Sequence, residues 1–301
     1  MKRGMNIGDA LEAPIEGEWG VTIKDEYFKI IKDAGFDTVR IPIKWSAHAA
    51  AQPPYTIDQE FFHRVDHVVE QSLKQKLYTI INIHHFDELI KEPVGQKERF
   101  LSIWNQIAEH YKAYPNALYF EVLNEPNGVL DQYWNDYLAE AIQVIRKSNP
   151  DRVIIAGPGN WNNISALENL KLPEEDRNII VTFHYYTPFW FTHQGAGWVN
   201  PSPPVGKKWE GFNEQKQFIE DELDKAVNWA KKHGRQLFMG EFGAYSKADM
   251  ESRVRWTSFV ARAAEERGIA WAYWEFCSGF GAYDPISGQW KEPLLRALIP
   301  C

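Results

Sequence analysis

Two glutamates follow apolar segments in distant parts of the sequence. Glu125 comes directly after the apolar run 118–124 and precedes Pro126, and Glu241 ends the run 236–241. If the two side chains meet, one carboxyl group can stay protonated while the other stays ionised, and such a pair can divide general-acid and nucleophilic work. The alternative interpretation is that each glutamate is a solvated loop residue or a local cap. The position of both residues at the end of an apolar run, and the rigid Pro126, favour the first interpretation.

Three histidines occupy similar positions and raise the question of a metal site. His84 and His85 end the run 78–85, and His184 lies within the run 179–185. Neighbouring side chains on a strand point to opposite faces, so His84 and His85 should diverge. No Asp or Glu with the spacing of a zinc hydrolase accompanies them. We therefore expect no metal site, and a buried histidine satisfied by hydrogen bonds is the alternative for each.

Eight short apolar runs recur along the chain, and near-continuous apolar runs are typical of parallel strands covered on both faces. We expect strands at Arg3–Gly8, Thr38–Ile43, Tyr78–His84, Leu118–Asn124, Arg152–Gly157, Ile179–Tyr185, Gln236–Glu241 and Ile269–Glu275.

Between these runs, apolar residues recur every three or four positions, which indicates helices that bury one face. The pattern is clearest at 100–111, 134–145 and 219–230. Helix-stop signals occur at Gly35, Asn149-Pro150, Gly234 and Gly268. Eight strand-then-helix units without a linker predict an α/β fold, a single (β/α)8 TIM barrel that forms one domain over residues 1–301. A doubly wound open sheet is the alternative, but no Gly-x-Gly-x-x-Gly follows any strand.

The interval Thr187–Phe212 is longer than the other connections and contains several aromatic residues. A connection of this length without secondary structure is usually functional or disordered. Because it follows the carboxyl end of a strand, where barrels carry their active sites, we favour a functional role.

The composition excludes several classes of protein. The chain has 301 residues, with 33 Lys and Arg against 41 Asp and Glu, and a formal charge of −8. An acidic chain has no basic face to meet phosphates, so we expect neither nucleic-acid nor membrane binding. The 13 Trp, 13 Tyr and 17 Phe demand burial and rule out a disordered chain.

Only two cysteines occur, Cys277 and Cys301, so a disulfide framework and a cysteine-based zinc site are excluded, although one bridge between the two stays open. The chain starts without the apolar stretch of a signal peptide. A cytoplasmic protein is expected if the chain is complete, and a secreted one if a leader was removed.

Three motifs in order along the chain resemble those of glycoside hydrolase family 5, the cellulase family A, and within it bacterial endoglucanases that also act on mannans. The motifs are Leu123-Asn-Glu-Pro, His184-Tyr-Tyr and Gly240-Glu-Phe-Gly. The resemblance covers nearly the whole chain, from Arg3-Gly-Met-Asn-Ile-Gly to Trp271-Ala-Tyr-Trp-Glu-Phe.

The resemblance implies roles for individual residues. Glu125 takes the position of the acid/base and Glu241 that of the nucleophile. Arg40 resembles the arginine near the nucleophile, although a structural ion pair with Glu121 is its alternative. By the same resemblance Tyr186 hydrogen-bonds the nucleophile, Asn124 holds the sugar 2-hydroxyl, and His84, His85 and His184 line the sugar site.

The tryptophans divide into two groups by position. Four lie on expected helices and should serve packing: Trp104, Trp134, Trp229 and Trp256. Four lie at or after strand ends, where flat apolar faces can stack on sugar rings: Trp45, Trp161, Trp198 and Trp274. The resemblance places Trp274 beneath the sugar at the cleavage point, and Trp198 and His193 at outer subsites.

Asp9 departs from the family, which commonly has Asn at this position. An ionised Asp donates no hydrogen bond, so a distal sugar hydroxyl would lose its donor, and the balance between glucan and mannan stays open. Glu12, from the same loop, resembles a sugar-binding acceptor.

Together these features predict an endo-acting retaining hydrolase of internal β-1,4 bonds in glucans, with a polysaccharide or oligosaccharide substrate. We expect a monomer that needs no cofactor. Retention requires the two carboxyl groups to lie about 5–5.5 Å apart. The alternatives are an endo-β-1,4-mannanase of the same family, an inactive carbohydrate-binding barrel, and a metal-dependent amidohydrolase barrel.

Overall fold

Eight parallel strands close into a barrel at the centre of the molecule. The structure, a computed structural model, describes residues 1–300. The strands are β1 (Arg3–Asn6), β2 (Thr38–Ile41), β3 (Tyr78–Asn82), β4 (Leu118–Glu121), β5 (Ile154–Ala156), β6 (Ile179–Tyr185), β7 (Gln236–Phe242) and β8 (Ala270–Tyr273). Each strand pairs with its sequence neighbours, and β1 pairs with β8 to close the ring. The predicted (β/α)8 barrel is confirmed.

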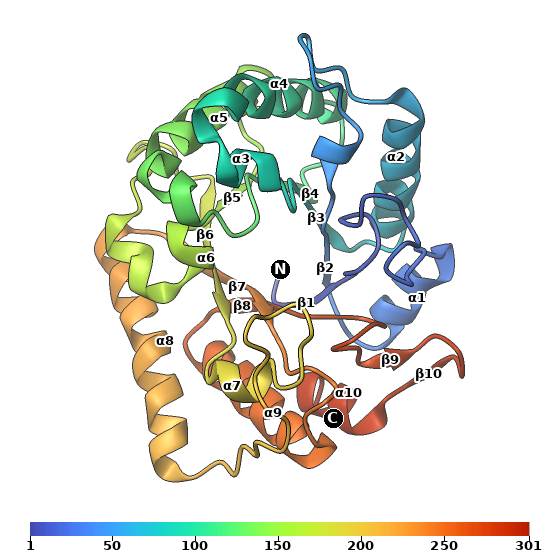
Figure 1. Cartoon of the computed structure of the whole chain (residues 1–301), viewed down its shortest axis with the longest axis vertical. Helices are drawn as coiled ribbons and strands as arrows, with labels where there is room; N and C mark the ends of the chain where they lie inside the picture. The colour runs from blue at the N-terminus through green and yellow to red at the C-terminus, as the bar shows by residue number, and fades with distance from the viewer. Residues whose placement is uncertain (301) are drawn as a thin grey trace.

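Helices surround the strands on the outside, as Figure 1 shows. They are α1 (Asp25–Asp33), α2 (Gln59–Lys74), α3 (Asp87–Lys91), α4 (Pro93–Tyr111), α5 (Trp134–Ser148), α6 (Gly159–Asn162), α7 (Phe189–Thr192), α8 (Asn213–His233), α9 (Met250–Glu266) and α10 (Glu292–Leu298). The three strongest helical patterns of the sequence correspond to α4, α5 and α8. Gly234 ends α8 with a φ of 61°, a left-handed conformation that glycine adopts without a steric cost.

Several strands end earlier than the sequence predicts. The third ends at Asn82 rather than His84, and the fourth at Glu121 rather than Asn124. The residues just beyond the strands are still buried, because the loops of the barrel mouth cover them. An apolar run in the sequence indicates that its residues are buried. A strand also requires backbone hydrogen bonds to a neighbouring strand, and these end before the apolar run does.

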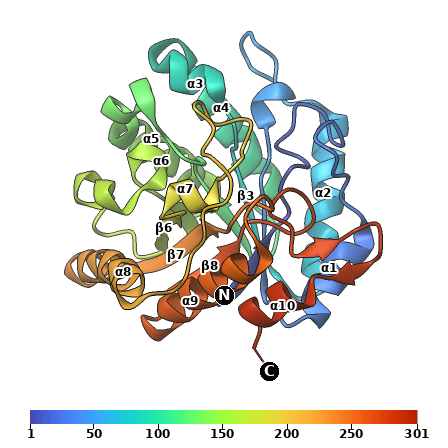
Figure 2. The ribbon, with the colours of Figure 1, turned by 60° about the horizontal axis from the view of Figure 1, so that its bottom comes forward.

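Two features of the fold were not predicted. A short antiparallel hairpin, β9 (Tyr283–Asp284) and β10 (Gln289–Trp290), precedes α10. The interval Thr187–Phe212 is not free of secondary structure, since it contains α7. Figure 2 shows α7 and the loop after it, in yellow, projecting over the carboxyl ends of β6 and β7.

The barrel interior has an apolar layer that supports a polar one. Ile80, Ile155, Phe238 and Ala272 form a small buried cluster contributed by four strands. A much larger core lies between the strands and the helices and includes the four tryptophans expected to serve packing, all of them buried. Among residues 1–300, no helix has both the length and the apolar character needed to cross a bilayer.

Candidate active site

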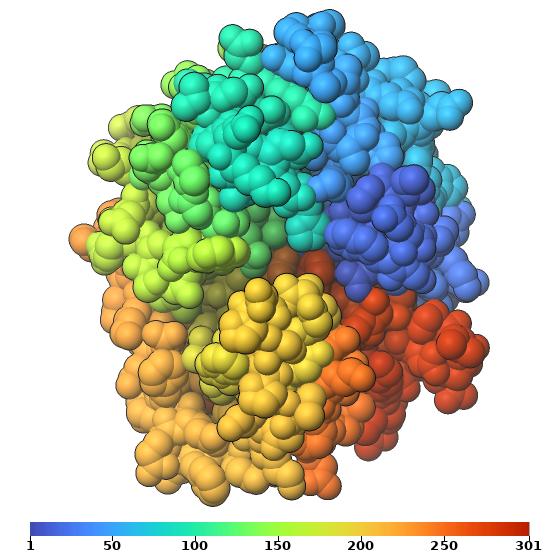
Figure 3. Space-filling view, in the orientation of Figure 1, coloured from blue at the N-terminus to red at the C-terminus, as the bar shows by residue number. Residues whose placement is uncertain are grey.

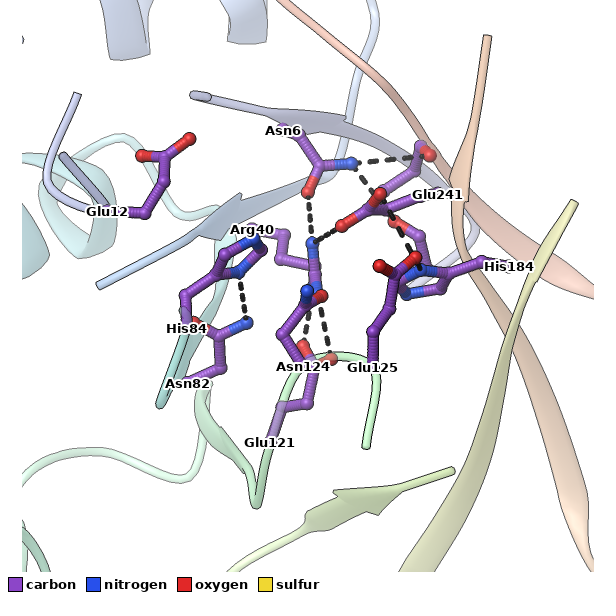
Figure 4. Close-up of polar contacts among 12 residues, drawn as sticks. Asn6, Glu12, Arg40, Asn82, His84, Glu121, Asn124, Glu125, His184 and Glu241 are labelled. Carbon is purple, nitrogen blue, oxygen red and sulfur yellow. Dashed lines mark hydrogen bonds and ion pairs between the residues drawn. The ribbon is translucent and has the colours of Figure 1, made fainter. Parts of the chain in front are cut away.

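Arg40, on β2, is the centre of a polar network inside the barrel. Its Nε and Nη2 donate to the two oxygens of Glu121 at 2.6 and 2.8 Å. Its Nη1 donates to Oε1 of Glu241 and to Oδ1 of Asn6, both at 2.8 Å. Figure 4 shows these side chains converging from separate strands. The structure therefore contains both of the pairings expected for Arg40, the ion pair with Glu121 and the contact with Glu241.

Glu241 lies near the end of β7, at a break in the regular strand pairing. The register between β6 and β7 shifts so that His184 is opposite Glu241 while Phe183 is opposite Met239, which leaves Gly240 as an extra residue. A bulge of this kind redirects the side chain that follows it. A Cβ on residue 240 would lie 2.7 Å from Oγ1 of Thr182, so only glycine fits there.

The surroundings of Glu241 favour its ionised form. Burial opposes ionisation, but the charges of His184 and Arg40 outweigh it, and the Tyr186 hydroxyl adds a hydrogen bond of 2.8 Å to Oε2. Together they hold the pKa of Glu241 below its usual value. An ionised carboxylate with fixed hydrogen bonds is suited to act as a nucleophile.

Glu125 is in a different environment. It lies four residues beyond β4, where its backbone takes a left-handed conformation with a φ of 48° before Pro126. Its Oε1 lies 2.6 Å from Nδ1 of His184. Burial is the largest influence and raises the pKa of Glu125, and the charge of Glu241 raises it further against the opposing effect of His184. Glu125 therefore holds a proton more readily than Glu241.

The two carboxyl groups are close to each other. One oxygen of Glu125, one oxygen of Glu241 and a ring nitrogen of His184 all lie within 4.8 Å of one another. This separation is close to that of retaining glycosidases, and it is shorter than the roughly 6.5–9.5 Å that leaves room for a water molecule in inverting ones. These three residues also form a geometric candidate for a metal site among residues 1–300.

His84 and His85 do not diverge as predicted. Their ring centroids are 4.5 Å apart, because β3 ends at Asn82 and His85 has a φ of 50°, so the alternation of a strand no longer applies. The ring of His84 is nearly parallel to that of Trp274, with centroids 6.0 Å apart. Trp19, which the sequence did not single out, lies 5.6 Å from His85 and is 42% exposed. These four rings form one wall of the mouth.

A second wall lies on the other side of Glu125. A cavity of about 500 Å³ opens there, lined by Glu125, His184, Trp161, Phe189, His193 and Trp198 among others. Trp161 and Trp198 are 54% and 62% exposed, so both present ring surface to a ligand. The buried Gln194 stabilises the loop by donating to the carbonyls of Phe191 and Lys207. Figure 3 shows that this face of the molecule is hollowed between the yellow loop and the teal segment opposite.

A larger cavity lies elsewhere in the molecule. It measures about 1080 Å³ and lies at the amino-terminal end of the barrel, beside Met1, Asp37 and Ile180. Barrel enzymes carry their chemistry at the carboxyl end, and the carboxylate pair lies there. The smaller cavity is therefore the candidate active site.

Two expectations for sugar contacts are wrong. Trp45 is completely buried, packs against Phe61 and Phe62, and donates its indole N–H to the carbonyl of Asn82, so its ring cannot stack on a sugar. Glu12 is also completely buried, and Figure 4 shows it apart from the central network.

The carboxyl group of Glu12 accepts hydrogen bonds from the backbone N–H groups of Asp9 and Ala10. It therefore shapes the loop after β1 rather than facing a ligand.

Burial raises the pKa of Asp9, and a hydrogen bond with the Ser278 side chain opposes that rise.

Sequence reasoning missed several polar residues of the site. Asn6 orients Arg40, and the amide of Asn82 lies 3.1 Å from Nδ1 of His84. Asn162 lies behind His184, with 3.5 Å between its Nδ2 and the ring's Nε2. For Asn6 and Asn82 the available signal was an amide near the end of a predicted strand, because an amide is costly to bury without a polar partner. Asn162 lies beyond the fifth predicted strand and carried no such signal.

A closed barrel with two unlike carboxyl groups at the ends of β4 and β7 defines a barrel glycoside hydrolase. Residues 3–279 match the family described as cellulase, glycosyl hydrolase family 5. The chain belongs to this family.

The similar proteins include cellulases of larger size. The chain is 40% identical over 276 residues to Endoglucanase H of Acetivibrio thermocellus, which covers 91% of this chain and 29% of that protein. It is 34% identical to the Cellulase/esterase CelE of the same organism, covering 99% of this chain and 38% of the relative. The chain thus spans about a third of the length of these curated relatives.

A solved structure of similar size also matches. Cel5A of Thermotoga maritima in complex with cellobiose is 54% identical, with a TM-score of 0.97 and coverage of 99% of this chain and 97% of that one. Another structure of Cel5A, with the same identity and TM-score, contains mannotriose.

Proposed function

We propose that this chain is a retaining endo-β-1,4-glucanase that works as a single catalytic domain. The observation that carries the proposal is the pair of carboxyl groups with oxygens within 4.8 Å of each other, one with a raised and one with a lowered pKa. The similarity to endoglucanases of family 5 supports the choice of β-1,4-glucan as substrate.

In the first step, ionised Glu241 attacks the anomeric carbon while protonated Glu125 gives its proton to the leaving glycosidic oxygen. A covalent bond between Glu241 and the sugar forms, and the aglycone departs with the proton. In the second step, Glu125 takes a proton from water, whose oxygen displaces Glu241. Two displacements at one carbon retain its configuration.

Asn124 is placed to hold a sugar hydroxyl. Its Oδ1 accepts from Nη2 of Arg40 at 2.7 Å, which fixes the orientation of the amide. The Nδ2 group is then left to donate, and we propose the 2-hydroxyl as its acceptor, a contact that strengthens in the transition state. Arg40 thus acts on both the nucleophile and the substrate-binding amide.

The two aromatic walls on either side of the carboxyl groups favour internal cleavage. We propose that Trp274, with His84 and His85 beside it, binds the sugars before the cleaved bond. Trp161, Trp198 and His193 bind those beyond it. A site with binding surface on both sides of the reacting bond accepts the interior of a polymer.

An endo-β-1,4-mannanase is the second candidate, because Cel5A has been solved with both cellobiose and mannotriose. Initial rates on carboxymethyl cellulose, barley β-glucan and glucomannan distinguish the two. A glucanase hydrolyses the first two readily, whereas activity confined to mannose-containing polymers would favour the mannanase. We also propose that the protein is a monomer and needs no cofactor. Unchanged activity after treatment with a metal chelator would support the absence of a metal cofactor.

The roles of the two glutamates are tested by chemical rescue. Glu241→Ala should lose activity on all substrates, and azide should restore a glycosyl azide of inverted configuration. Glu125→Ala should still form the glycosyl-enzyme from a dinitrophenyl glycoside, whose leaving group needs no proton. Identical behaviour of the two variants on this substrate would contradict the assignment.

A further inference from the structure

Three consecutive residues after β5 have an unusual backbone. Asn160, Trp161 and Asn162 have φ values of 53°, 57° and 53°, in the left-handed region that residues other than glycine rarely adopt. Such a conformation costs free energy and persists where surrounding contacts impose it, often at functional sites. The turn places Trp161 toward the cleft and Asn162 in the interior, where it is completely buried.

The buried amide of Asn162 contacts the histidine behind the acid/base. Its Nδ2 lies 3.5 Å from Nε2 of His184, whose other nitrogen is 2.6 Å from Oε1 of Glu125. Glycines leave the space for this arrangement. A Cβ on Gly157 would lie 2.4 Å from Oδ1 of Asn162, and one on Gly240 would lie 3.2 Å from Nε2 of His184.

The second polar atom of the amide has no hydrogen-bond partner among the described residues that would fix which way the amide is turned. Within residues 1–300, Oδ1 of Asn162 is buried and has no hydrogen-bond partner. An amide can present either a donor or an acceptor, depending on its rotation. Asn162 can therefore donate to Nε2 when the ring of His184 is neutral and accept from Nε2–H when the ring is protonated.

We propose that Asn162 is a positioning residue for the acid/base, and that it acts by keeping a proton on Nδ1 of His184 in both states of the ring. This inference rests on the proposed function. Nδ1–H donates to Oε1 of Glu125 throughout the reaction. The proton that Glu125 gives to the leaving oxygen and later takes from water is consequently held on Oε2.

The substitution Asn162→Asp tests this role with almost no change in volume. A carboxylate can only accept, so it draws the proton of the neutral ring onto Nε2 and leaves Nδ1 without a proton facing Glu125. We expect kcat on a nitrophenyl cellobioside with a poor leaving group to fall by about tenfold or more, and the rate with a dinitrophenyl leaving group to change by less than about twofold.

The matched control is Asn169→Asp, which makes the same chemical change at an exposed residue outside the cleft. It should leave both rates unchanged. Equal losses on both substrates for Asn162→Asp, or no loss on either, would overturn the proposal. If Asn162→Asp fails to fold, as judged by circular dichroism, Asn162→Ser and the following measurement on the wild type decide.

Nitrogen NMR of the wild-type protein with labelled histidine reads the position of the proton directly. Glu125, Glu241, Arg40 and His84 are the charged or titratable groups that act on His184, so spectra are recorded over a range of pH. We expect Nδ1 to remain protonated throughout. A neutral ring with its proton on Nε2 would overturn the proposal. Because this measurement needs no turnover, it remains informative even if the chain proves inactive on every β-1,4-glycan.

Discussion

The pKa values of Glu125 and Glu241 are shifted in opposite directions because the two carboxyl groups have different partners. Glu241 receives hydrogen bonds from Arg40 and Tyr186 and is close to His184. Glu125 has His184 as its one polar side-chain partner within hydrogen-bond distance among residues 1–300, and its backbone carbonyl accepts from Asn127. The opposite shifts of the two pKa values support the proposed roles of Glu125 as the acid and Glu241 as the nucleophile.

The substitution Tyr186→Phe should move the acidic limb of the pH profile. The Tyr186 hydroxyl donates to Glu241 and lowers the pKa of that carboxyl group. Its removal raises the pKa of Glu241, so a higher pH is needed to ionise the nucleophile. We expect the acidic limb of kcat/KM to shift upward by about one pH unit.

The control for this prediction is Tyr111→Phe, which removes another buried hydroxyl, on α4, that does not contact Glu125 or Glu241. It should leave the pH profile unchanged. A downward shift of the acidic limb in Tyr186→Phe would show that the hydroxyl does not stabilise the ionised form.

At the scale of elements, the connection from β6 to α8 forms much of the second wall of the cleft. Trp198 packs edge-on against Tyr245, with centroids 4.9 Å apart, yet 62% of its surface is exposed. The buried Gln194 ties the same segment together through both of its polar atoms. The connection is therefore an ordered wall that presents an aromatic face, and not a structureless loop.

Truncation of this face should affect polymers and spare small substrates. If Trp198 stacks on a sugar beyond the cleaved bond, Trp198→Ala should reduce kcat/KM on long chains by a factor equivalent to about 1–3 kcal/mol. An aryl glycoside that occupies only the first wall should be hydrolysed at a nearly unchanged rate. Kinetics on both substrates test this prediction.

The control is Trp190→Ala, since Trp190 is 53% exposed on α7 but does not line the cavity. Equal losses on both substrates for Trp198→Ala would instead indicate that Trp198 holds the barrel mouth together. Unchanged kinetics on both would place it outside the binding surface.

At the scale of the whole molecule, buried carboxyl groups link stability to pH. Glu12 and Glu275 are completely buried near the loops that follow β1 and β8. Burial raises the pKa of each to about 8, although backbone N–H groups oppose the rise. The unfolded chain releases these protons near pH 4.5, so between pH 4.5 and 8 the folded state binds more protons than the unfolded state.

The free energy of unfolding should therefore fall as the pH rises through this window. Each group should contribute a loss of about 1.4 kcal/mol per pH unit. The substitution Glu275→Gln should reduce the slope by about that amount relative to the wild type, because glutamine does not titrate. Guanidinium unfolding at several values between pH 5 and 8 measures the slope.

Comparison with the wild type at each pH cancels the contributions of the other groups, and Glu175→Gln, at an exposed position, serves as the control. If Glu275→Gln had the same slope as the wild type, Glu275 would be ionised in the folded protein. Its hydrogen bonds from the backbone N–H groups of Cys277, Ser278 and Phe280 would then outweigh its burial.

The sequence alone was sufficient to predict the barrel and the convergence of Glu125 and Glu241. Eight apolar runs alternate with amphipathic stretches, and parallel strands covered by helices require that alternation. Helices α4, α5 and α8 could be predicted because apolar residues that recur with a 3.6-residue period indicate the buried face of a helix. Cys301, half of the one disulfide that the sequence left open, lies outside the described residues, while Cys277 is buried.

The tertiary structure decided what lies beyond the strand ends. Periodicity cannot show where a strand loses its hydrogen-bonded neighbour, so the divergence of His84 and His85 was predicted wrongly, and Trp45 and Glu12 were expected at the ligand. Nor does it indicate the left-handed backbone at Glu125 or at Asn162. Those conformations, and the pairing of Arg40 with Glu121 and Glu241 across 81 and 201 positions, depend on contacts between distant segments that exist only once the barrel has closed.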